Sequence, residues 1–315
     1  MNYTRREFLG MAGAAAGAGL ALPLTGCKSG FARVKEATGR RLRGSKMKPG
    51  IFAARGGDPY RLTIEAVRAA GGMESLVRKG DKVVIKPNMA WDRKPEQAAN
   101  TNPEVMRALV EMCRKAGAGE VAVFDRPCNE ARQTYARSGI ADAAKKAGAR
   151  VPFVDERRFV EIKIPKGLIL KKWAVFTEIL DADVFINVPI VKHHSLAGIT
   201  VGLKNLMGCV GGDRGQWHKG QLHQRIADIN TAIPANLTVV DAFRILTAHG
   251  PQGGSLSDVI EVNTIAVCTD PVAADAYGAT LFGVEARDVD HIRIAYEMGQ
   301  GEIDLNAVGI HEFDV

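Results

Sequence analysis

Short β-branched runs alternate with helix-length amphipathic segments through most of the chain, and this alternation constrains the fold more than any other feature. The clearest unit begins with a strand at 82–86, which Pro87 closes. A capping box with proline in the first helical turn follows at 101–104, and a helix then leads to a second strand at 121–125. Strand–helix–strand units of this kind build parallel sheets with right-handed crossovers. The pattern therefore predicts an α/β protein.

Further strands and helices repeat the pattern, and near-continuous apolar strands such as 237–240 suit a sheet that is covered on both faces. With 315 residues, 46% of them hydrophobic, the chain has ample material for a buried core. We predict a mostly parallel sheet with helices on both faces, in a single α/β domain over residues 50–315. The remaining strands are expected at 151–154, 184–188, 237–241 and 263–269, and the helices at 59–78, 130–147, 172–181, 221–232, 272–282 and 288–298.

The N-terminus has the pattern of an export signal. The pair Arg5-Arg6 stands directly before an Ala/Gly-rich apolar stretch at 8–24. A membrane-spanning helix needs about 20 strongly apolar residues, whereas this stretch is short and diluted by glycine, as is typical of twin-arginine signals. An amphipathic helix is the alternative, but the stretch has no polar face. We predict a twin-arginine signal peptide over residues 1–26, recognised by the twin-arginine export machinery.

The signal ends in Leu24-Thr25-Gly26-Cys27, which resembles a bacterial lipoprotein box. Its position favours lipidation of Cys27 over a plain small-residue cleavage site beside a bystander cysteine. Residues 27–49 are then expected to form a basic tether above an anionic membrane surface. These features predict an exported protein on the periplasmic or cell-envelope side, anchored to the membrane through lipid on Cys27.

Charge and cysteine content narrow the function classes. The net charge of +7 is mild, and only 6% of residues are aromatic, which argues against nucleic-acid binding. Twin-arginine substrates fold in the reducing cytoplasm, commonly around a cofactor. The remaining cysteines are therefore expected as free thiols, and a bound cofactor or divalent metal becomes more credible. These cysteines are Cys113, Cys128, Cys209 and Cys268.

Polar side chains gather where the predicted strands end, and ligands of open α/β sheets bind beyond those carboxyl ends. Cationic and amide side chains there suit a carboxylate or phosphate ligand. Histidines and carboxylates suit acid/base catalysis near neutral pH or, in part, coordination of a divalent metal. We expect one cleft to contain both sets. The anion-binding candidates are Lys86, Asn88, Lys192, Lys204, Asn205 and Arg214, the catalytic candidates are His194, His218, Asp241 and Asp275, and the metal candidates are His194, His218 and Asp241.

Other residues at these strand ends have simpler structural interpretations. Asp270-Pro271 reads as a helix N-cap followed by proline at the first position. His193 and His194 are adjacent, so on a strand they point to opposite sides. The loop at 250–254 lacks the ending of a phosphate-binding P-loop, which argues against binding of a nucleoside triphosphate. No Gly-x-Gly-x-x-Gly follows a strand, which argues against a dinucleotide-binding fold.

These motifs together resemble one known family. They are Val84-Ile85-Lys86-Pro87-Asn88, Thr101-x-Pro103, Asn187-x-Pro189-x-x-Lys192-x-His194, Leu203-Lys204-Asn205, Gly250-Pro251-x-Gly253 and Thr269-Asp270-Pro271-Val272-Ala273-Ala274-Asp275. The chain resembles the domain of unknown function 362 family from about residue 50 onward, and that family name implies no general activity. Some members add a ferredoxin-type cysteine cluster. This chain has no Cys-x-x-Cys, so an iron–sulfur role does not carry over.

Two function classes remain open from the sequence. One is a metal- or acid/base-assisted enzyme that acts on a small anionic substrate. The other is a membrane-tethered binding protein for an anion or a metal-bearing cofactor, without turnover. Convergence of His and Asp side chains at coordination distance would favour the enzyme, and a basic pocket with those residues scattered would favour binding.

Overall fold

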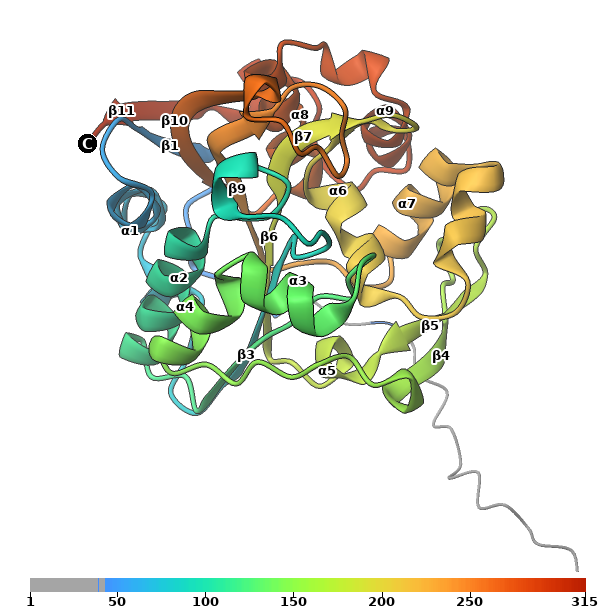
Figure 1. The fold of residues 1–315 in the computed structure, drawn as a ribbon, viewed down its shortest axis with the longest axis horizontal. Helices are drawn as coiled ribbons and strands as arrows, with labels where there is room; N and C mark the ends of the chain where they lie inside the picture. Colours follow the sequence, from blue (N-terminus) through green and yellow to red (C-terminus); the bar gives the residue numbers. More distant parts are fainter. Residues whose placement is uncertain (1–38, 40–42) are drawn as a thin grey trace, which may run out of the picture. The chain divides into compact units, whose positions relative to one another are not determined.

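The computed structural model describes residue 39 and residues 43–315, which belong to one compact unit (Figure 1). The predicted signal peptide, Cys27 and most of the expected tether lie outside the described residues. The end of that tether, at 43–49, packs on the domain. Arg43 forms an ion pair with Asp81 at 2.6 Å between Nη2 and Oδ2, and Met47 is buried. The domain therefore begins before residue 50.

Within the described residues, the main sheet is mostly parallel and has nine strands. Its order is β11-β1-β10-β9-β6-β2-β3, with β7 added beside β9 and β8 beside β7, while β4 and β5 form a separate antiparallel pair. The strands are β1 (Ile51–Arg55), β2 (Lys82–Pro87), β3 (Glu120–Val123), β4 (Phe159–Lys163), β5 (Lys172–Phe176), β6 (Val184–Val188), β7 (Ile190–His194), β8 (Gly198–Thr200), β9 (Leu237–Leu246), β10 (Val259–Cys268) and β11 (Ile310–Asp314).

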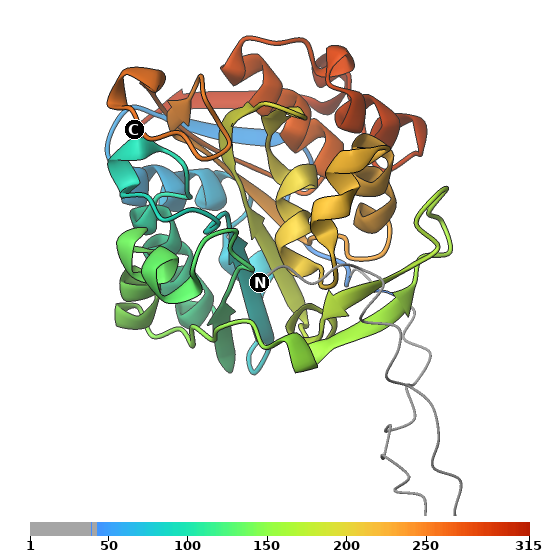
Figure 2. The same ribbon diagram turned by 45° about the vertical axis from the view of Figure 1, so that its right-hand side comes forward.

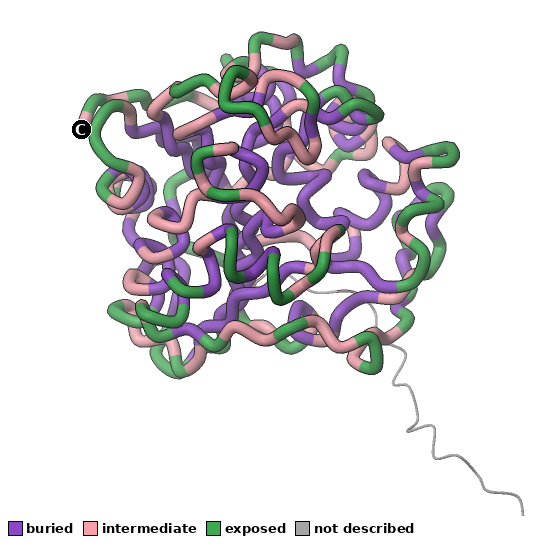
Figure 3. Tube along the Cα trace, in the orientation of Figure 1, coloured by how far each residue is buried: buried purple, intermediate pink, exposed green. Residues whose placement is uncertain are grey.

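Helices cover both faces of this sheet, as Figure 2 shows, which confirms the predicted fold class. Side chains of each strand alternate between two apolar cores: Val83 and Ile85 join the core under α1, α2 and α4, and Val84 joins the core under α7, α8 and α9. Buried residues fill the interior (Figure 3). The helices are α1 (Pro59–Ala69), α2 (Pro103–Lys115), α3 (Ala131–Arg137), α4 (Ile140–Lys146), α5 (Thr177–Leu180), α6 (Gly202–Asn205), α7 (Leu222–Asn230), α8 (Pro271–Phe282), α9 (Asp290–Glu297) and α10 (Leu305–Val308).

Several expected elements differ from those observed. The helix expected at 172–181 begins as strand β5, because these residues pair with β4, and only α5 is helical. The strand expected at 151–154 is absent from the structure. The helix expected at 130–147 is divided into α3 and α4 by Gly139, which has a φ of +72°.

Helix starts follow the sequence signals closely. Asp270 accepts hydrogen bonds from the N–H groups of Val272 and Ala273, and Pro271 opens α8, so the predicted N-cap is confirmed. The predicted capping box at 101–104 does not form, and the N-cap lies one residue later. Asn102 caps this helix, which begins at Pro103, because the Thr101 hydroxyl is bonded elsewhere.

A bend at Pro189 positions the candidate site. It separates β6 from β7, and β9 runs parallel to both strands in turn. Asp241, expected at the end of a strand, therefore lies in the middle of β9 and faces Ile190 of β7 in the register. No helix in the described part of the chain is long and apolar enough to cross a membrane.

Candidate functional site

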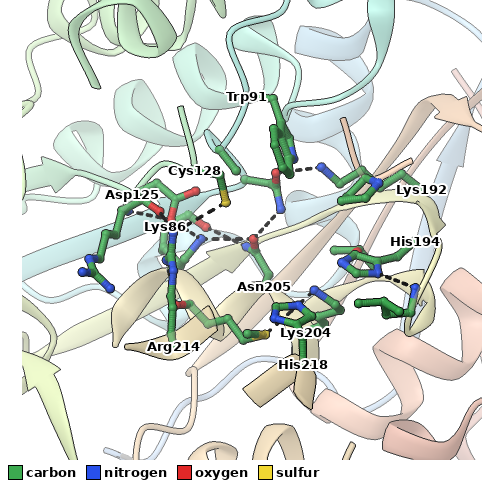
Figure 4. A pocket seen from close by; sticks show the side chains of 18 of the residues that line it. Lys86, Trp91, Asp125, Cys128, Lys192, His194, Lys204, Asn205, Arg214 and His218 are labelled. Carbon is green, nitrogen blue, oxygen red and sulfur yellow. Dashed lines mark hydrogen bonds and ion pairs between the residues drawn. The ribbon is translucent and has the colours of Figure 1, made fainter. Parts of the chain in front are cut away.

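A cavity of about 280 Å³ lies beyond the ends of β2 and β3 and against the β7–β8 hairpin and α6 (Figure 4). Ligand pockets are commonly about 300–1,000 Å³, so the cavity suits a small molecule. It is lined by Lys86, Asn88, Ala90, Trp91, Asp125, Arg126, Cys128, Lys192, His194, Ser195, Leu196, Thr200, Lys204, Asn205, Met207, Gly208, Arg214, His218 and Pro251.

On one side of the cavity, Lys86 is held by a complete set of partners. Its ammonium lies 2.8 Å from Oδ1 of Asp125 and donates hydrogen bonds to the Pro87 carbonyl (2.6 Å) and to Oδ1 of Asn205 (3.0 Å). Both members of the ion pair are buried. An ammonium has three N–H donors, so Lys86 keeps none for a ligand. Lys86 therefore has no free N–H donor with which to bind an anion, the role that the sequence predicts for it.

Asn205 connects this ion pair to the neighbouring strands. Its Oδ1 accepts hydrogen bonds from Lys86 and from Asn88, and its Nδ2 donates to Asn187 and to the Lys86 carbonyl. Asn88 in turn accepts a hydrogen bond from Nζ of Lys192 at 3.1 Å. Asn205 is thus saturated within the protein, and the network extends from Asp125 to Lys192.

Gly208 makes room for the ion pair. A Cβ at this position would lie 1.8 Å from Oδ1 of Asp125 and 2.7 Å from Nζ of Lys86. No side chain fits there without displacing the pair. The glycine is therefore required by the contact itself rather than by backbone conformation.

The β7–β8 hairpin brings three polar side chains to the cavity. Lys192 and His194 lie two residues apart on β7, so they share a face, and Thr200 is the direct antiparallel partner of Lys192. Nζ of Lys192 donates to Asn88 and to the Ala99 carbonyl, which leaves one ammonium donor. The buried Oγ1 of Thr200 has no hydrogen-bond partner.

Lys204 reaches the same cavity from α6. Its Nζ has one weak contact, to Sδ of Met207 at 3.8 Å, although the residue is only 9% exposed. Burial lowers the pKa of Lys204 to about 8, and Arg214 nearby contributes in the same direction. Burial lowers the pKa of Lys192 to about 7, with the charge of Lys204 adding to the effect. Burial therefore makes the charged form of both lysines unfavourable, and neither ammonium has a carboxylate partner.

His194 and His218 face each other as stacked rings with centroids 5.9 Å apart. Nδ1 of His194 accepts hydrogen bonds from the N–H groups of Leu196 and Ala197, so its proton resides on Nε2. Nδ1 of His218 contacts the Gly215 carbonyl at 3.3 Å, an acceptor, which leaves Nε2 of His218 unprotonated. The two rings therefore offer one donor and one proton acceptor.

Both rings are neutral at pH 7. Burial and the nearby charges of Lys204 and Lys192 lower the pKa of His194 to about 2. Burial lowers the pKa of His218 as well, with Lys204 adding to the effect. A neutral imidazole can accept a proton, and the lysines beside it disfavour a second positive charge.

Arg214 braces the cavity wall. Its guanidinium donates to the carbonyls of Met207, Arg126 and Pro127 and lies 3.6 Å from Sγ of Cys128. It adds positive charge to the cavity, but its bonded nitrogens are directed at the backbone. In the structure, Cys113, Cys128, Cys209 and Cys268 are free thiols, and of these only Cys128 lines the cavity.

Asp241 and Asp275 do not line the cavity, which corrects the expectation of a single cleft. Asp241 accepts hydrogen bonds from the N–H groups of Asn102 and Phe243, and burial raises its pKa to about 6. Asp275 accepts from the N–H groups of Gly202 and Leu203 at the start of α6, and burial raises its pKa to about 8. Both carboxyl groups accept hydrogen bonds from backbone N–H groups. Asp275 thereby positions the helix that bears Lys204.

The metal set expected from the sequence is not assembled, because Asp241 lies away from the cavity that the two histidines line. Among the described residues, no group of three or more His, Cys, Asp or Glu side chains could hold a metal ion. Each sequence-predicted anion-binding residue does line the cavity, together with His194 and His218.

Sequence reasoning missed Asp125 and Thr200 as members of the site. Asp125 was detectable, since it follows β3 directly, β3 pairs with β2, and β2 ends with Lys86. Thr200 belongs to the motifs that resemble the family, but its place opposite Lys192 could not be predicted, because β8 is a three-residue strand whose pairing with β7 only the structure reveals.

Comparison with known proteins gives a family match and distant structural likenesses. The family described as "Domain of unknown function (DUF362)" matches residues 83–280. A thylakoid-associated protein of Synechocystis sp. is 29% identical over 222 residues, which are 65% of this chain and 64% of that protein. The chain thus spans less than two thirds of the length of this curated relative.

Among solved structures, the lactate racemase apoprotein from Thermoanaerobacterium thermosaccharolyticum aligns with a TM-score of 0.48 at 12% identity, over 76% of this chain and 58% of that one. A protein from Thermotoga maritima aligns with a TM-score of 0.42 at 11% identity, over 76% of this chain and 60% of that one.

Proposed function

The chain belongs to the family of the domain of unknown function DUF362, and from that premise we propose that its cavity binds a small carboxylate- or phosphate-bearing molecule and transfers protons to or from it. One observation carries the proposal. Lys192, Lys204 and Arg214 line the cavity, and the only carboxylate among the lining residues, Asp125, is paired with Lys86. An anion would supply the missing negative charge and the missing hydrogen-bond acceptors.

The two histidines support the proton-transfer part of the proposal. His218 offers an unprotonated Nε2, and His194 offers an Nε2–H donor, beside the cations that would hold the anion. A base and a hydrogen-bond donor next to a bound substrate are the elements of general acid/base catalysis. Lys192 and Lys204 would favour negative charge that develops on the substrate.

Anion binding is tested by isothermal titration calorimetry of the full chain with oxalate, lactate and inorganic phosphate at low and high salt. We expect at least one to bind, more weakly at high salt, and Lys204→Met to weaken binding by about tenfold or more, as loss of a charge-assisted hydrogen bond does. Lys145→Met is the matched control, since Lys145 is exposed on α4. Equal binding by both variants would contradict the proposal.

Binding without turnover is the second candidate, favoured by the positions of Asp241 and Asp275 outside the cavity. The two candidates differ in C–H exchange. With pyruvate in D₂O, an acid/base site would accelerate loss of the methyl proton signal in NMR spectra, and His218→Gln would remove that acceleration. A pure binding protein would retain pyruvate and leave the exchange rate unchanged.

We also propose that the chain is exported by the twin-arginine route and anchored by lipid on Cys27. The support is the sequence pattern of Arg5-Arg6 and Leu24-Thr25-Gly26-Cys27. Replacing both arginines with lysine should retain the protein in the cytoplasm, and Cys27→Ser should release it from the membrane fraction. Unchanged fractionation of both variants would refute the targeting proposal.

A further inference from the structure

Lys204 differs from the other buried lysines of the cavity in what holds its amine. Lys86 is bonded to a carboxylate, a carbonyl and an amide oxygen, and Lys192 is bonded to an amide oxygen and a carbonyl. The amine of Lys204 contacts only the thioether of Met207, at 3.8 Å. A thioether is a weak acceptor, so this amine retains its freedom to approach a ligand.

The surroundings of Lys204 favour the neutral, nucleophilic amine. The residue is buried, no carboxylate other than the paired Asp125 lines the cavity, and Arg214 adds positive charge. These conditions lower its pKa to about 8, so a substantial fraction is unprotonated in mildly alkaline solution. Lysines desolvated beside other cations are the ones that attack carbonyl groups.

Two further hydrogen-bond donors line the same cavity as this amine. In its charged form, which a bound carboxylate favours, Lys192 retains one N–H donor, and Thr200 retains its hydroxyl. The two residues are direct partners across the β7–β8 hairpin. Thr200 and Lys204 are separated by one short turn of chain, at the end of β8 and within α6. A small ligand that carries a carboxylate on these two donors would present its adjacent carbon to the cavity that Lys204 lines.

We propose that Lys204 forms an imine with the carbonyl carbon of a small 2-oxo acid whose carboxylate is bound by Lys192 and Thr200, an inference that rests on the proposed anion-binding function. Figure 4 shows Lys204 and His218 next to each other at the side of the cavity where His194 lies. The two stacked histidines supply the proton acceptor and the donor that the reaction needs.

The step balances without any oxidant or reductant. The lone pair of Nζ forms a C–N bond while the carbonyl π pair moves to oxygen, near the Nε2–H of His194. The ammonium so formed gives a proton to Nε2 of His218. His218 returns that proton to the alkoxide, which forms the carbinolamine. The nitrogen lone pair then forms the C=N bond while the hydroxyl leaves, and the second N–H proton passes through His218 to the leaving oxygen, so that water departs.

The test is reductive trapping on the full wild-type chain. The protein is incubated at pH 8 with pyruvate and sodium cyanoborohydride, and peptides are mapped by mass spectrometry. We expect the reduced adduct on Lys204 at about ten times the yield on exposed Lys145, since desolvation favours the neutral, nucleophilic amine at Lys204, and this amine, unlike that of Lys192, is not bonded to oxygen acceptors. Thr200→Val should lower the yield at Lys204, whereas Lys204→Arg should abolish the dominant adduct.

Calorimetry with lactate separates this inference from the proposed function, because lactate has the carboxylate without the carbonyl. Binding of lactate and pyruvate with no excess adduct at Lys204 would overturn the imine and leave anion binding intact. A dominant adduct at Lys192 would overturn the assignment of the nucleophile. Binding of neither acid would overturn the imine, and if oxalate and inorganic phosphate also failed to bind, the proposed anion binding would be overturned with it. The wild-type map needs no variant, so a variant that fails to fold does not affect the result.

Discussion

The two walls of the cavity differ in how completely their buried polar groups are hydrogen-bonded within the protein. The paired wall (Lys86, Asn88, Asp125 and Asn205) satisfies its charged and amide groups almost entirely within the protein. The open wall (Thr200, Lys204, His194 and His218) leaves a hydroxyl unbonded and an ammonium without an anionic partner. A satisfied network rigidifies a fold, whereas unsatisfied groups lower its stability. The residues that line this cavity therefore divide into those that stabilise its structure and those that are available to a ligand.

The largest effect is expected from Asp125→Ala on the paired wall. It leaves the buried ammonium of Lys86 without its anion and also removes the acceptor of the Met89 and Arg126 N–H groups. Breaking a buried ion pair costs about 3–5 kcal/mol. Urea unfolding should show this loss. The double variant with Lys86→Met should recover much of the lost unfolding free energy. A loss below about 1 kcal/mol in the single variant would refute the stabilising role of the ion pair.

Gly208→Ala should destabilise the same wall less severely. Its methyl group would overlap Oδ1 of Asp125. Overpacking of this kind lowers the free energy of unfolding by about 1–3 kcal/mol. Gly44→Ala is the control, because a Cβ on Gly44 meets nothing within 4 Å. Thermal unfolding of both variants measures the difference, and equal melting temperatures would show that the Lys86–Asp125 pair can move aside freely.

Lys204→Met on the open wall should stabilise the protein at pH 7 by about 1–3 kcal/mol while weakening anion binding. The folded state lowers the pKa of Lys204 from 10.5 to about 8, so between these values the unfolded chain binds more protons than the folded one. The contribution of this lysine to stability therefore rises with pH across that interval. The advantage of the variant should be full below pH 8 and shrink towards pH 10. Urea titrations of both proteins at pH 7 and pH 10 measure the difference in unfolding free energy. A difference that does not change with pH would contradict the lowered pKa of Lys204.

The smallest effect separates two buried threonines. Thr101 donates to the Val188 carbonyl and accepts from the Asn88 N–H, so Thr101→Val should cost about 1–3 kcal/mol. Thr200→Val removes a hydroxyl that has no partner and should change stability by less than about 0.5 kcal/mol. Chemical unfolding of the pair at one pH is sufficient. Equal losses of unfolding free energy in the two variants would mean that the Thr200 hydroxyl is hydrogen-bonded like that of Thr101 and is not available to a ligand.

Much of this fold could be predicted from local patterns. The strands β2, β6 and β9, the helices α2 and α8, and the N-cap Asp270 follow from β-branched runs, amphipathic spacing and capping residues. The same patterns failed at 172–181, where an amphipathic segment pairs with β4 instead of forming a helix from its start. Local sequence does not encode whether an extended partner lies beside a segment, and pairing of that kind overrides helix preference.

At the site, local sequence indicates which residue types follow β2 and β6, and this placement predicts that Lys86 and Lys192 lie near one another, with Lys204 on the segment that follows. Only the tertiary structure decided what each one does. Lys86 meets Asp125 from the next strand and becomes structural, while Lys204 meets no carboxylate and remains available. Asp241 and Asp275, which sequence placement made catalytic candidates, instead receive backbone N–H groups from distant segments. The physical reason is that a buried charge is defined by its partners, and these partners come from residues far apart in the chain.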